Sequence, residues 1–509
     1  MGIIKRQSLK TSIVNYIGVV IGVIFFNFVF PHILSEEYLG LIGLLQNLMF
    51  VLVSIPSLGL GHVLLRYYSI WKDTPQVEAF HAFAIQVMLL SISVFGIFYW
   101  LFHQPITAYY QQQSPLFVPY YYLVIPLVAI FAFIQYFEIY SMLKLRVAVP
   151  AFLREIVVRI LLILLVFLFV KKYLSESYFV WGIVAVYLLS FIILLTYVLR
   201  ILQFKAYGAS LITRHSKQYK EAFQYGGGML LLMIATNVHN FLDGIILPAY
   251  LGLGALGIYI RPLVLGQMIQ VPYRAISMIS IPIIREAIVD NNLKKVYELN
   301  KQLSINLYLI GTFLFTLLIS NADAIFSLLP PQYAVAKNVL YIIALGRLID
   351  MAFGLNSEIL NYSKHYKYII ILSVFMMLMT IALNMLLIPR LGMSGAAIAV
   401  SASLVIFNIL KTLVIYSKYH FHCFSKHYIT LSLITLFVLG IMQLIPYIKF
   451  LSHHMFMNAC INILFKCALS SILFLLPTYW FRVSYDLNHF VKLILTGQII
   501  KGGHKMENL

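Results

Sequence analysis

Apolar runs of about 20 residues recur along the whole chain, and they restrict its possible folds more than any other feature of the sequence. A helix of about 20 apolar residues crosses the hydrocarbon core of a bilayer. Backbone groups in lipid must be bonded within the chain, and these runs lack the short alternating pattern of membrane strands. The expected fold is therefore an all-α polytopic membrane protein.

Fourteen membrane spans are expected, separated by charged or Pro/Gly-containing breaks. Those of the first half lie near residues 11–30, 38–60, 80–102, 118–143, 156–170, 179–199 and 223–248. Those of the second half lie near residues 256–281, 303–322, 338–360, 368–388, 395–416, 429–447 and 459–480. With 62% hydrophobic and only 10% charged residues, this chain of 509 residues has lipid as its solvent.

Lysine and arginine are distributed unevenly between the two sets of connecting segments. If the N-terminus lies inside, 26 of the 36 basic residues fall in inner segments and 5 in outer ones. Because cytoplasmic segments retain positive charge, both termini are expected in the cytoplasm. The basic residues form no stripe, so no nucleic acid partner is expected. No cofactor or metal is expected either, because the sequence lacks a phosphate-binding glycine loop and a familiar metal-ligand spacing.

A short repeat indicates two related halves. Its four positions lie at the turn between the first two spans of each half and recur at an offset of 217 residues: Pro31 and Pro248, Leu34 and Leu251, Leu39 and Leu256, Gly40 and Gly257. The long basic segment near residues 200–222 joins the halves. We expect a six-helix lobe over 1–210, a second over 211–420, and two further helices with a cytoplasmic tail over 421–509.

Four local patterns carry a resemblance to a known family. They are Asn15-Tyr16-Ile17-Gly18, the turn from Pro31 to Gly40, Ser57-Leu58-Gly59-Leu60-Gly61, and the long stretch from Asn384 to Ala397. With the hydrophobic pattern of the whole chain, they resemble the polysaccharide (O-antigen, Wzx-type) flippases of the multidrug/oligosaccharidyl-lipid/polysaccharide exporter (MOP) superfamily.

The resemblance implies a MATE-like fold of two six-helix lobes around a central cavity, with two additional C-terminal helices. It implies alternating access that moves an undecaprenyl-diphosphate-linked oligosaccharide from the inner to the outer leaflet of the bacterial cytoplasmic (inner) membrane. The pathway would be O-antigen lipopolysaccharide, capsule or exopolysaccharide synthesis. Expected partners are that substrate, membrane lipids, a glycan polymerase and chain-length proteins. Such a protein is a transporter and not an enzyme.

Polar residues inside the spans are the candidate site residues, because a charge at the bilayer centre costs about 2.5 to 3.5 kcal/mol unless it is paired or hydrated. On the eighth span, Gln267, Gln270 and Arg274 fall within one helical face. Arg261 lies nearer the outer end of that span. Arginine binds phosphate bidentately, so all four residues are expected to bind the diphosphate-linked substrate. The structural alternative pairs Arg261 with Asp243 and lets Arg274 reach the inner interface.

A second polar face lies on the seventh span. His239 and Asn240 are expected to contact the substrate, and Asp243 to bind a coupling proton or sodium ion. A packed polar contact between helices is the structural alternative.

The tenth span carries Arg347, Asp350 and Glu358 on one expected stripe with Gly354. Arg347 is a candidate for substrate binding and Glu358 for a coupling ion. The favoured structural interpretation is that Arg347 and Asp350, three residues apart, neutralise each other.

Two lysines, each considered with one other residue, complete the set of polar positions. On the last span, Asn462 and Lys466 are candidates for the lipid phosphate, unless Lys466 extends outward to the interface. Lys411 and Glu138 lie close to inner helix ends and are expected to extend toward the water.

Two other functions compete with a flippase. A multidrug extruder of the same superfamily usually has twelve spans and cationic substrates, so fourteen spans and several deep arginines argue against it. A membrane glycan polymerase or ligase tends to carry a large outer loop, whereas the longest one expected here covers only residues 103–118.

The orientation predicts the result of two reporter fusions. A reporter active only outside the cytoplasm should work when fused after Gln112, because the surrounding outer segment is uncharged. It should be inactive when fused after Ser216, within the basic connecting segment. Activity at the second position would invert the topology.

Overall fold

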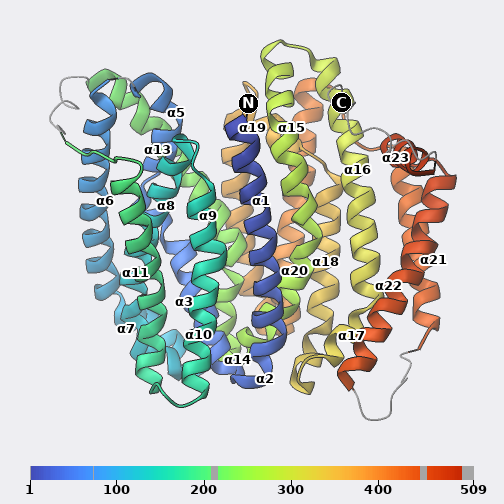
Figure 1. Cartoon of the computed structure of the whole chain (residues 1–509), viewed down its shortest axis with the longest axis horizontal. Coiled ribbons are helices and arrows are strands. Elements are labelled where there is room, and N and C mark those ends of the chain that lie inside the picture. Colours follow the sequence, from blue (N-terminus) through green and yellow to red (C-terminus); the bar gives the residue numbers. More distant parts are fainter. Residues whose placement is uncertain (1, 73, 208–215, 447–454, 496–509) are drawn as a thin grey trace. The chain divides into compact units, whose positions relative to one another are not determined.

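The computed structural model describes residues 2–72, 74–207, 216–446 and 455–495. Over these ranges every regular element is a helix and no strand occurs, which confirms the all-α expectation. Figure 1 shows long helices joined by short connections within each part of the chain.

Packing divides the chain into two compact units. The first unit holds residues 1–261 and 373–400, and the second holds residues 262–372 and 401–509. Two long helices, α14 (Asp243–Gln267) and α20 (Tyr366–Tyr419), contribute residues to both units. The lobes expected from chain order have other boundaries, and they stay a prediction.

The first unit contains the N-terminal helices together with parts of α14 and α20. Its other elements are α1 (Gly2–Gly22), η1 (Val23–Val29), α2 (Phe30–Ile33), α3 (Glu36–Leu52), α4 (Ser54–Ser57), α5 (Leu60–Trp71), α6 (Gln76–Leu101), α7 (His103–Gln111), η2 (Pro115–Leu123), α8 (Val124–Leu143), α9 (Ala148–Phe152), η3 (Leu153–Val157), α10 (Val158–Val170), α11 (Glu176–Arg200) and α13 (Ser216–Phe241). Within this unit α8 packs against α5 and α11, and α10 packs against α11.

The second unit contains the remaining helices. They are η4 (Met268–Gln270), α15 (Val271–Val289), α16 (Leu293–Ser320), α17 (Ala322–Ser327), η5 (Pro331–Ala336), α18 (Lys337–Ala352), α19 (Asn356–Tyr362), α21 (Lys426–Leu444), α22 (Met455–Trp480) and α23 (Tyr485–Leu495). Helix α16 packs against α15, α18, α21 and α22, so it is the central helix of this unit.

Ten helices in the described part of the chain are long and apolar enough to cross a membrane, or eleven if a bent pair is counted as one span. The expected number of fourteen is therefore not confirmed. Two of the ten helical segments are 55 and 54 residues long, and each contains a non-helical glycine, Gly252 or Gly392. At 1.5 Å per residue each would extend to about 80 Å, which is more than twice the hydrocarbon thickness.

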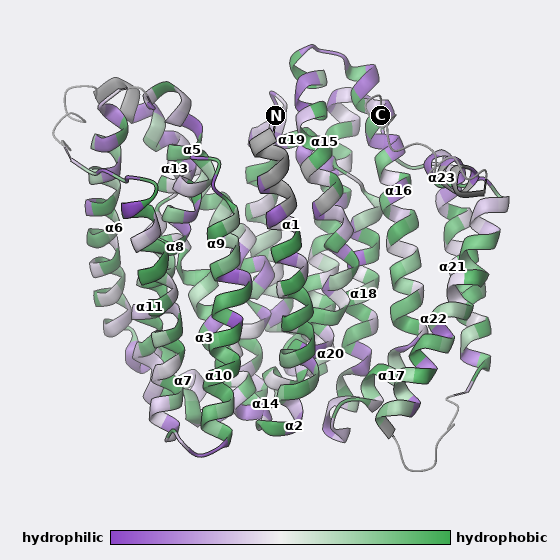
Figure 2. Cartoon of the chain, in the orientation of Figure 1, coloured by the Kyte–Doolittle hydropathy of each residue, from purple (hydrophilic) through white to green (hydrophobic). Residues whose placement is uncertain are grey.

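Apolar side chains lie on the surface of the protein as well as in its core. Leu90 of α6 and Leu436 of α21 are each 66% exposed. Figure 2 shows hydrophobic residues along the middle of the helices and hydrophilic residues mainly near their ends. Exposed apolar surface of this extent requires lipid around it, so the chain is a multi-pass membrane protein.

The two turns of the sequence repeat meet inside the first unit. A Cβ atom on Gly40 would collide with the backbone carbonyl of Leu253, and one on Gly257 would collide with the carbonyl of Glu36. Leu253 follows Glu36 by the same 217 residues that separate Gly257 from Gly40. The contact is therefore reciprocal, and it depends on glycine because only glycine lets two helix backbones approach this closely.

This contact predicts a strong effect of a single added methyl group. Gly40→Ala and Gly257→Ala should each lower stability by about 3 kcal/mol, because a backbone carbonyl cannot rotate away as a side chain can. Fluorescence-detected size-exclusion scans against temperature would measure the loss. Gly227→Ala is the matched control, since no atom lies within 4 Å of a Cβ there. An equal effect of all three substitutions would contradict the reciprocal contact.

Candidate functional site

A network of buried polar side chains lies within the second unit and connects η4 with α18 and α20. Gln270 is at its centre: its Oε1 accepts a hydrogen bond from Arg347 Nη1 at 3.0 Å, and its Nε2 donates to Asp350. Asp350 also accepts from Asn408 Nδ2 at 2.5 Å. Arg347 and Asn408 are almost fully buried, so these contacts form away from lipid and water.

Lys411 brings a second cation to this network. Its Nζ donates to Ser357 Oγ at 2.7 Å, and the carboxylates of Asp350 and Glu358 attract it electrostatically. Glu358 in turn accepts from the Tyr273 hydroxyl, which lies 2.9 Å from both carboxylate oxygens. Lys411 is only 4% exposed. The expectation that Lys411 extends to the interface was wrong. Its ammonium group instead lies among packed helices, where Ser357 and the two carboxylates hold it.

The four charged residues of the network balance in formal charge, with two cations, Arg347 and Lys411, and two carboxylates, Asp350 and Glu358. An isolated charge inside a membrane helix is costly, whereas a neutral set with additional hydrogen bonds is tolerated. Removing one member leaves the others uncompensated. The network is therefore a single electrostatic unit.

Breaks in the helices place these side chains. The 3₁₀ turn η4 lies between α14 and α15, so Gln267, Gln270 and Arg274 are not on one regular α-helix; that they share a face stays a prediction. α18 and α19 form a bent pair at an angle of 51°, with Gly354 at φ 61° between them. The expected stripe through Gly354 is therefore divided, and Gln270 links Arg347 to Asp350.

The other candidates of the eighth span differ in exposure. Arg274 of α15 is exposed, and Gln267 at the end of α14 is half-buried. The second unit has two candidate arginines. The guanidinium of Arg347 is buried and donates to Gln270, so that of Arg274 is the more accessible of the two.

The candidates on the last membrane helix are buried. Asn462 of α22 donates to the Asn458 carbonyl at 2.8 Å, and Lys466 is only 5% exposed. The interpretation that Lys466 extends outward to the interface does not fit this burial. Both residues occupy the packed side of α22.

The candidates of the first unit form separate contacts. His239 Nδ1 lies 3.0 Å from Thr380 Oγ1, and the Tyr259 hydroxyl donates to Asp243 Oδ2 at 2.5 Å. Arg261 Nη1 donates to the Phe26 carbonyl at 2.5 Å, in the π-helical segment η1. His239, Asp243 and Arg261 are all buried, whereas Asn240 is half-buried.

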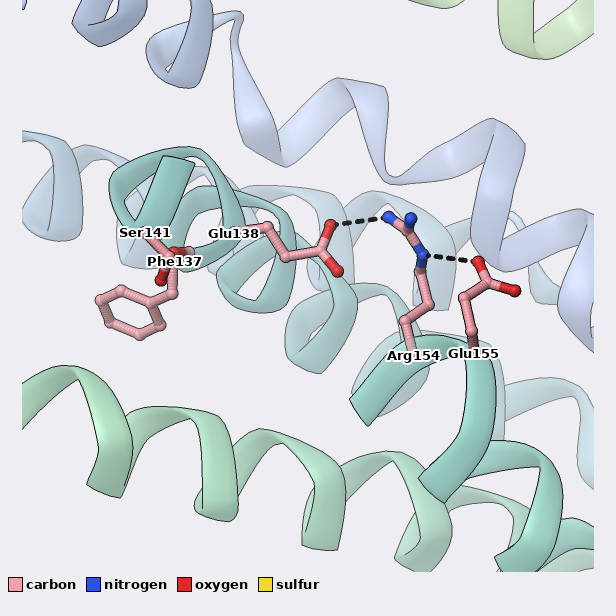
Figure 3. A network of polar contacts seen from close by, with 5 residues as sticks. All are labelled: Phe137, Glu138, Ser141, Arg154 and Glu155. Carbon is pink, nitrogen blue, oxygen red and sulfur yellow. Dashed lines mark hydrogen bonds and ion pairs between the residues drawn. The ribbon is translucent and has the colours of Figure 1, made fainter. Parts of the chain in front are cut away.

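The first unit also contains a chain of ion pairs that the sequence analysis missed. Arg154 lies between two carboxylates, with Nη1 3.0 Å from Glu138 and Nε 3.1 Å from Glu155, as Figure 3 shows. Glu155 also forms an ion pair with Arg159, whose Nη2 lies 2.8 Å from Glu155 Oε2. Glu138 was expected to extend toward water, but Arg154 holds it. The sequence could have indicated these ion pairs, because Arg154, Glu155 and Arg159 lie within two helical turns of one another.

Helix α1 accommodates this chain through two glycines. Gly18 leaves room for the backbone and Cβ of Glu155, and Gly22 leaves room for the guanidinium of Arg159. The π-helix η3 carries Arg154 and Glu155, and π turns often occur where side chains have special roles. Arg159 Nη1 is buried without a hydrogen-bond partner among the described residues. It is a guanidinium donor available to an anion or a water molecule.

No group of three or more potential metal ligands occurs among the residues for which the structure is described. The polar residues instead form hydrogen bonds and ion pairs with one another. They can bind a polar or anionic ligand, or gain and lose protons.

The sequence profile of a family described as "Polysaccharide biosynthesis protein" matches residues 4–288, which is more than half of the chain. No curated protein sequence matches the chain significantly.

Solved structures share the fold over most of the chain. Lipid II flippase MurJ, in an inward closed conformation, has a TM-score of 0.68 at 16% identity and covers 92% of this chain and 98% of its own. An inward-facing multidrug resistance MATE family transporter of the MOP superfamily has a TM-score of 0.60 at 14% identity, covering 79% and 93%. A MOP superfamily transporter from Pyrococcus furiosus has 0.53 at 14%, covering 82% and 95%. The expected MATE-like fold is confirmed.

The neutral network predicts how charge changes combine. Asp350→Asn should cost about 3 to 5 kcal/mol, because it leaves two buried cations with one carboxylate. Adding Lys411→Met should recover much of that loss, since neutrality is restored. Thermal scans in detergent would measure both.

Asp323→Asn is the matched control for this prediction. Asp323 pairs with Lys337 at the surface, where its side chain is 66% exposed, so its loss should change stability by less than about 1 kcal/mol. A double variant no more stable than Asp350→Asn alone would contradict the charge-balance argument.

Proposed function

We infer that this chain, which belongs to the polysaccharide biosynthesis protein family, moves a lipid-linked oligosaccharide across the membrane. The observation that carries this proposal is the family match over residues 4–288. The fold supports it, because flippases and transporters of the MOP superfamily share it over most of their length. We place the protein in the cytoplasmic (inner) membrane of a bacterium.

The physical task explains why such a substrate needs a protein. A glycan and a diphosphate cannot cross about 30 Å of hydrocarbon unaided, because their polar groups would lose their hydrogen bonds to water. A polyprenyl tail can stay in lipid while the polar head moves along polar side chains. The substrate we propose is an undecaprenyl-diphosphate-linked oligosaccharide for O-antigen, capsule or exopolysaccharide synthesis, flipped by alternating access. A glycan polymerase and chain-length proteins would act on it afterwards.

Arg274 is the residue that we propose contacts the diphosphate. Its side chain is exposed, whereas Arg261 and Arg347 are buried and donate to Phe26 and Gln270. Guanidinium stays charged at every physiological pH and binds phosphate with two parallel hydrogen bonds.

The other polar candidates have lesser roles in this proposal. Half-buried Gln267 and Asn240 can bond sugar hydroxyls. The buried candidates, Arg261, Arg347, His239, Asn462 and Lys466, would act by holding together the helices of the unit to which each belongs.

The driving force has two candidate sources. Asp243 and Glu358 accept hydrogen bonds from Tyr259 and Tyr273, and a proton or sodium ion could compete for either carboxylate. Alternatively, two negative charges leaving a negative cytoplasm gain about 4 to 5 kcal/mol at 100 mV, which could drive flipping without a coupled ion.

The second candidate function, extrusion of drugs, has support from the fold, since a multidrug MATE transporter shares it at a TM-score of 0.60. The family match favours the glycan substrate over this alternative. A drug-resistance assay on the expressed chain separates the two.

The role of Arg274 predicts a specific loss of flipping. Arg274→Ala should abolish complementation of a flippase-deficient strain while immunoblots show normal abundance, because an exposed side chain contributes little to packing. Arg274→Lys should restore only part of the activity, since a point charge replaces a planar fork.

Arg285→Ala is the control for Arg274. Arg285 is exposed on the same helix, α15, more than two turns closer to its C-terminal end, and its loss should leave flipping intact. Full activity of Arg274→Ala at normal abundance would remove Arg274 from the site.

A further inference from the structure

A cavity of about 350 Å³ lies at the surface of the first unit and is largely open, where the end of α2 meets the end of α10. Its walls are mostly apolar and include Leu34, Phe169 and Val170. The polar side chains that line it are Ser35, Tyr38 and Lys172. By the distribution of basic residues, this end of the unit faces outward. The cavity thus combines an apolar wall with a cationic rim at the level of the outer membrane interface.

Aromatic contacts and a carboxylate fix the wall of the cavity. The ring of Phe169 stacks on Phe179 at 4.3 Å and meets Tyr38 edge-on at 5.1 Å. The Tyr38 hydroxyl donates to Glu176 Oε2 at 2.9 Å, and Tyr120 donates to the other oxygen at 3.1 Å. Glu176 is therefore engaged by two hydroxyl groups and does not line the cavity. The only charged side chain on its wall is Lys172.

The position of Lys172 is unusual for its side of the membrane. Outer segments hold only five of the basic residues, and two of them, Lys171 and Lys172, are adjacent here. Lys172 has a left-handed backbone, at φ 62°, because it caps the C-terminal end of α10: its N–H bonds to the Phe169 carbonyl and that of Tyr173 to the Leu168 carbonyl. Lys171 does not line the cavity. A ligand with negative charge at the rim would give Lys172 a function.

We propose that this cavity binds one anionic phospholipid of the outer leaflet, with its phosphodiester at Lys172 and an acyl segment against Leu34, Phe169 and Val170. Lipids with acidic head groups bind where basic residues adjoin apolar helix surfaces. One ammonium group matches the single charge of a phosphodiester. A diphosphate carries more charge and favours arginine forks, which this rim lacks. The proposed ligand is thus different from the proposed substrate, and the proposal does not depend on the proposed function.

Native mass spectrometry of the purified full chain tests this proposal. After delipidation, the protein would be mixed with phosphatidylglycerol or with phosphatidylcholine, and bound lipids counted. One phosphatidylglycerol should be retained in preference to phosphatidylcholine. Lys172→Gln should weaken its retention about fivefold, the effect of one basic residue near an anionic lipid surface. Val170→Trp, which fills the cavity without changing charge, should displace the same lipid.

Lys171→Gln is the matched control, because it makes the same charge change next to the cavity but outside it. It should retain the lipid. Equal loss in the two glutamine variants would overturn the proposal, since the effect would then be surface charge alone. Retention of the lipid by Lys172→Gln, equal binding of phosphatidylcholine, or displacement by undecaprenyl diphosphate would overturn it as well.

Discussion

The cost of placing a charge or an unbonded backbone group in hydrocarbon governs the rest of this structure. It requires helices, and it requires that charged side chains inside them be neutralised within a few ångströms. Both units meet this requirement in the same way. In the second unit, Asp350 accepts hydrogen bonds from Gln270 and Asn408 and attracts Lys411, and in the first unit Glu138 and Glu155 both pair with Arg154. The polar groups therefore hold the helices of each unit together.

Irregular backbone occurs where these polar groups lie. The 3₁₀ turn η4 presents Gln270, the bend at Gly354 divides α18 from α19, and the π-helix η3 carries Arg154 and Glu155. Each departure from α-helical geometry turns a side chain away from the face that a regular helix would give it. Transporters use such interrupted helices because irregular backbone is tolerated in a membrane only where it is enclosed by protein or lines a polar path.

The fold was predictable from sequence because its main determinant, hydropathy over about 20 residues, is local. The candidate site was less predictable because its partners are distant along the chain. The position of Lys411 near a helix end does not predict its contact with Ser357, which lies on another helix and 54 residues earlier in the chain. The spacing of Gln267, Gln270 and Arg274 indicates one face only if the helix is regular. Pro272, which follows η4 and has no backbone N–H, is the local signal for an irregular backbone there. Likewise, the run Arg154, Glu155 and Arg159 could have been interpreted as an ion-paired segment.

The sequences of the two repeat turns, residues 31–40 and 248–257, are interchangeable in one direction but not in the other. Their contact uses only the carbonyls of Glu36 and Leu253 and the bare Cα atoms of Gly40 and Gly257, so either ten-residue turn supplies the atoms that the other needs. Ser35, however, has an extended backbone with φ −65°, whereas its counterpart Gly252 has φ 88° and ψ 163°, a conformation essentially limited to glycine. Replacing residues 31–40 by the sequence of residues 248–257 keeps every backbone angle accessible. The reverse replacement puts serine at position 252, where the backbone angles favour glycine alone. If the halves arose by duplication, exchange of sequence between the two turns is structurally permitted in one direction only.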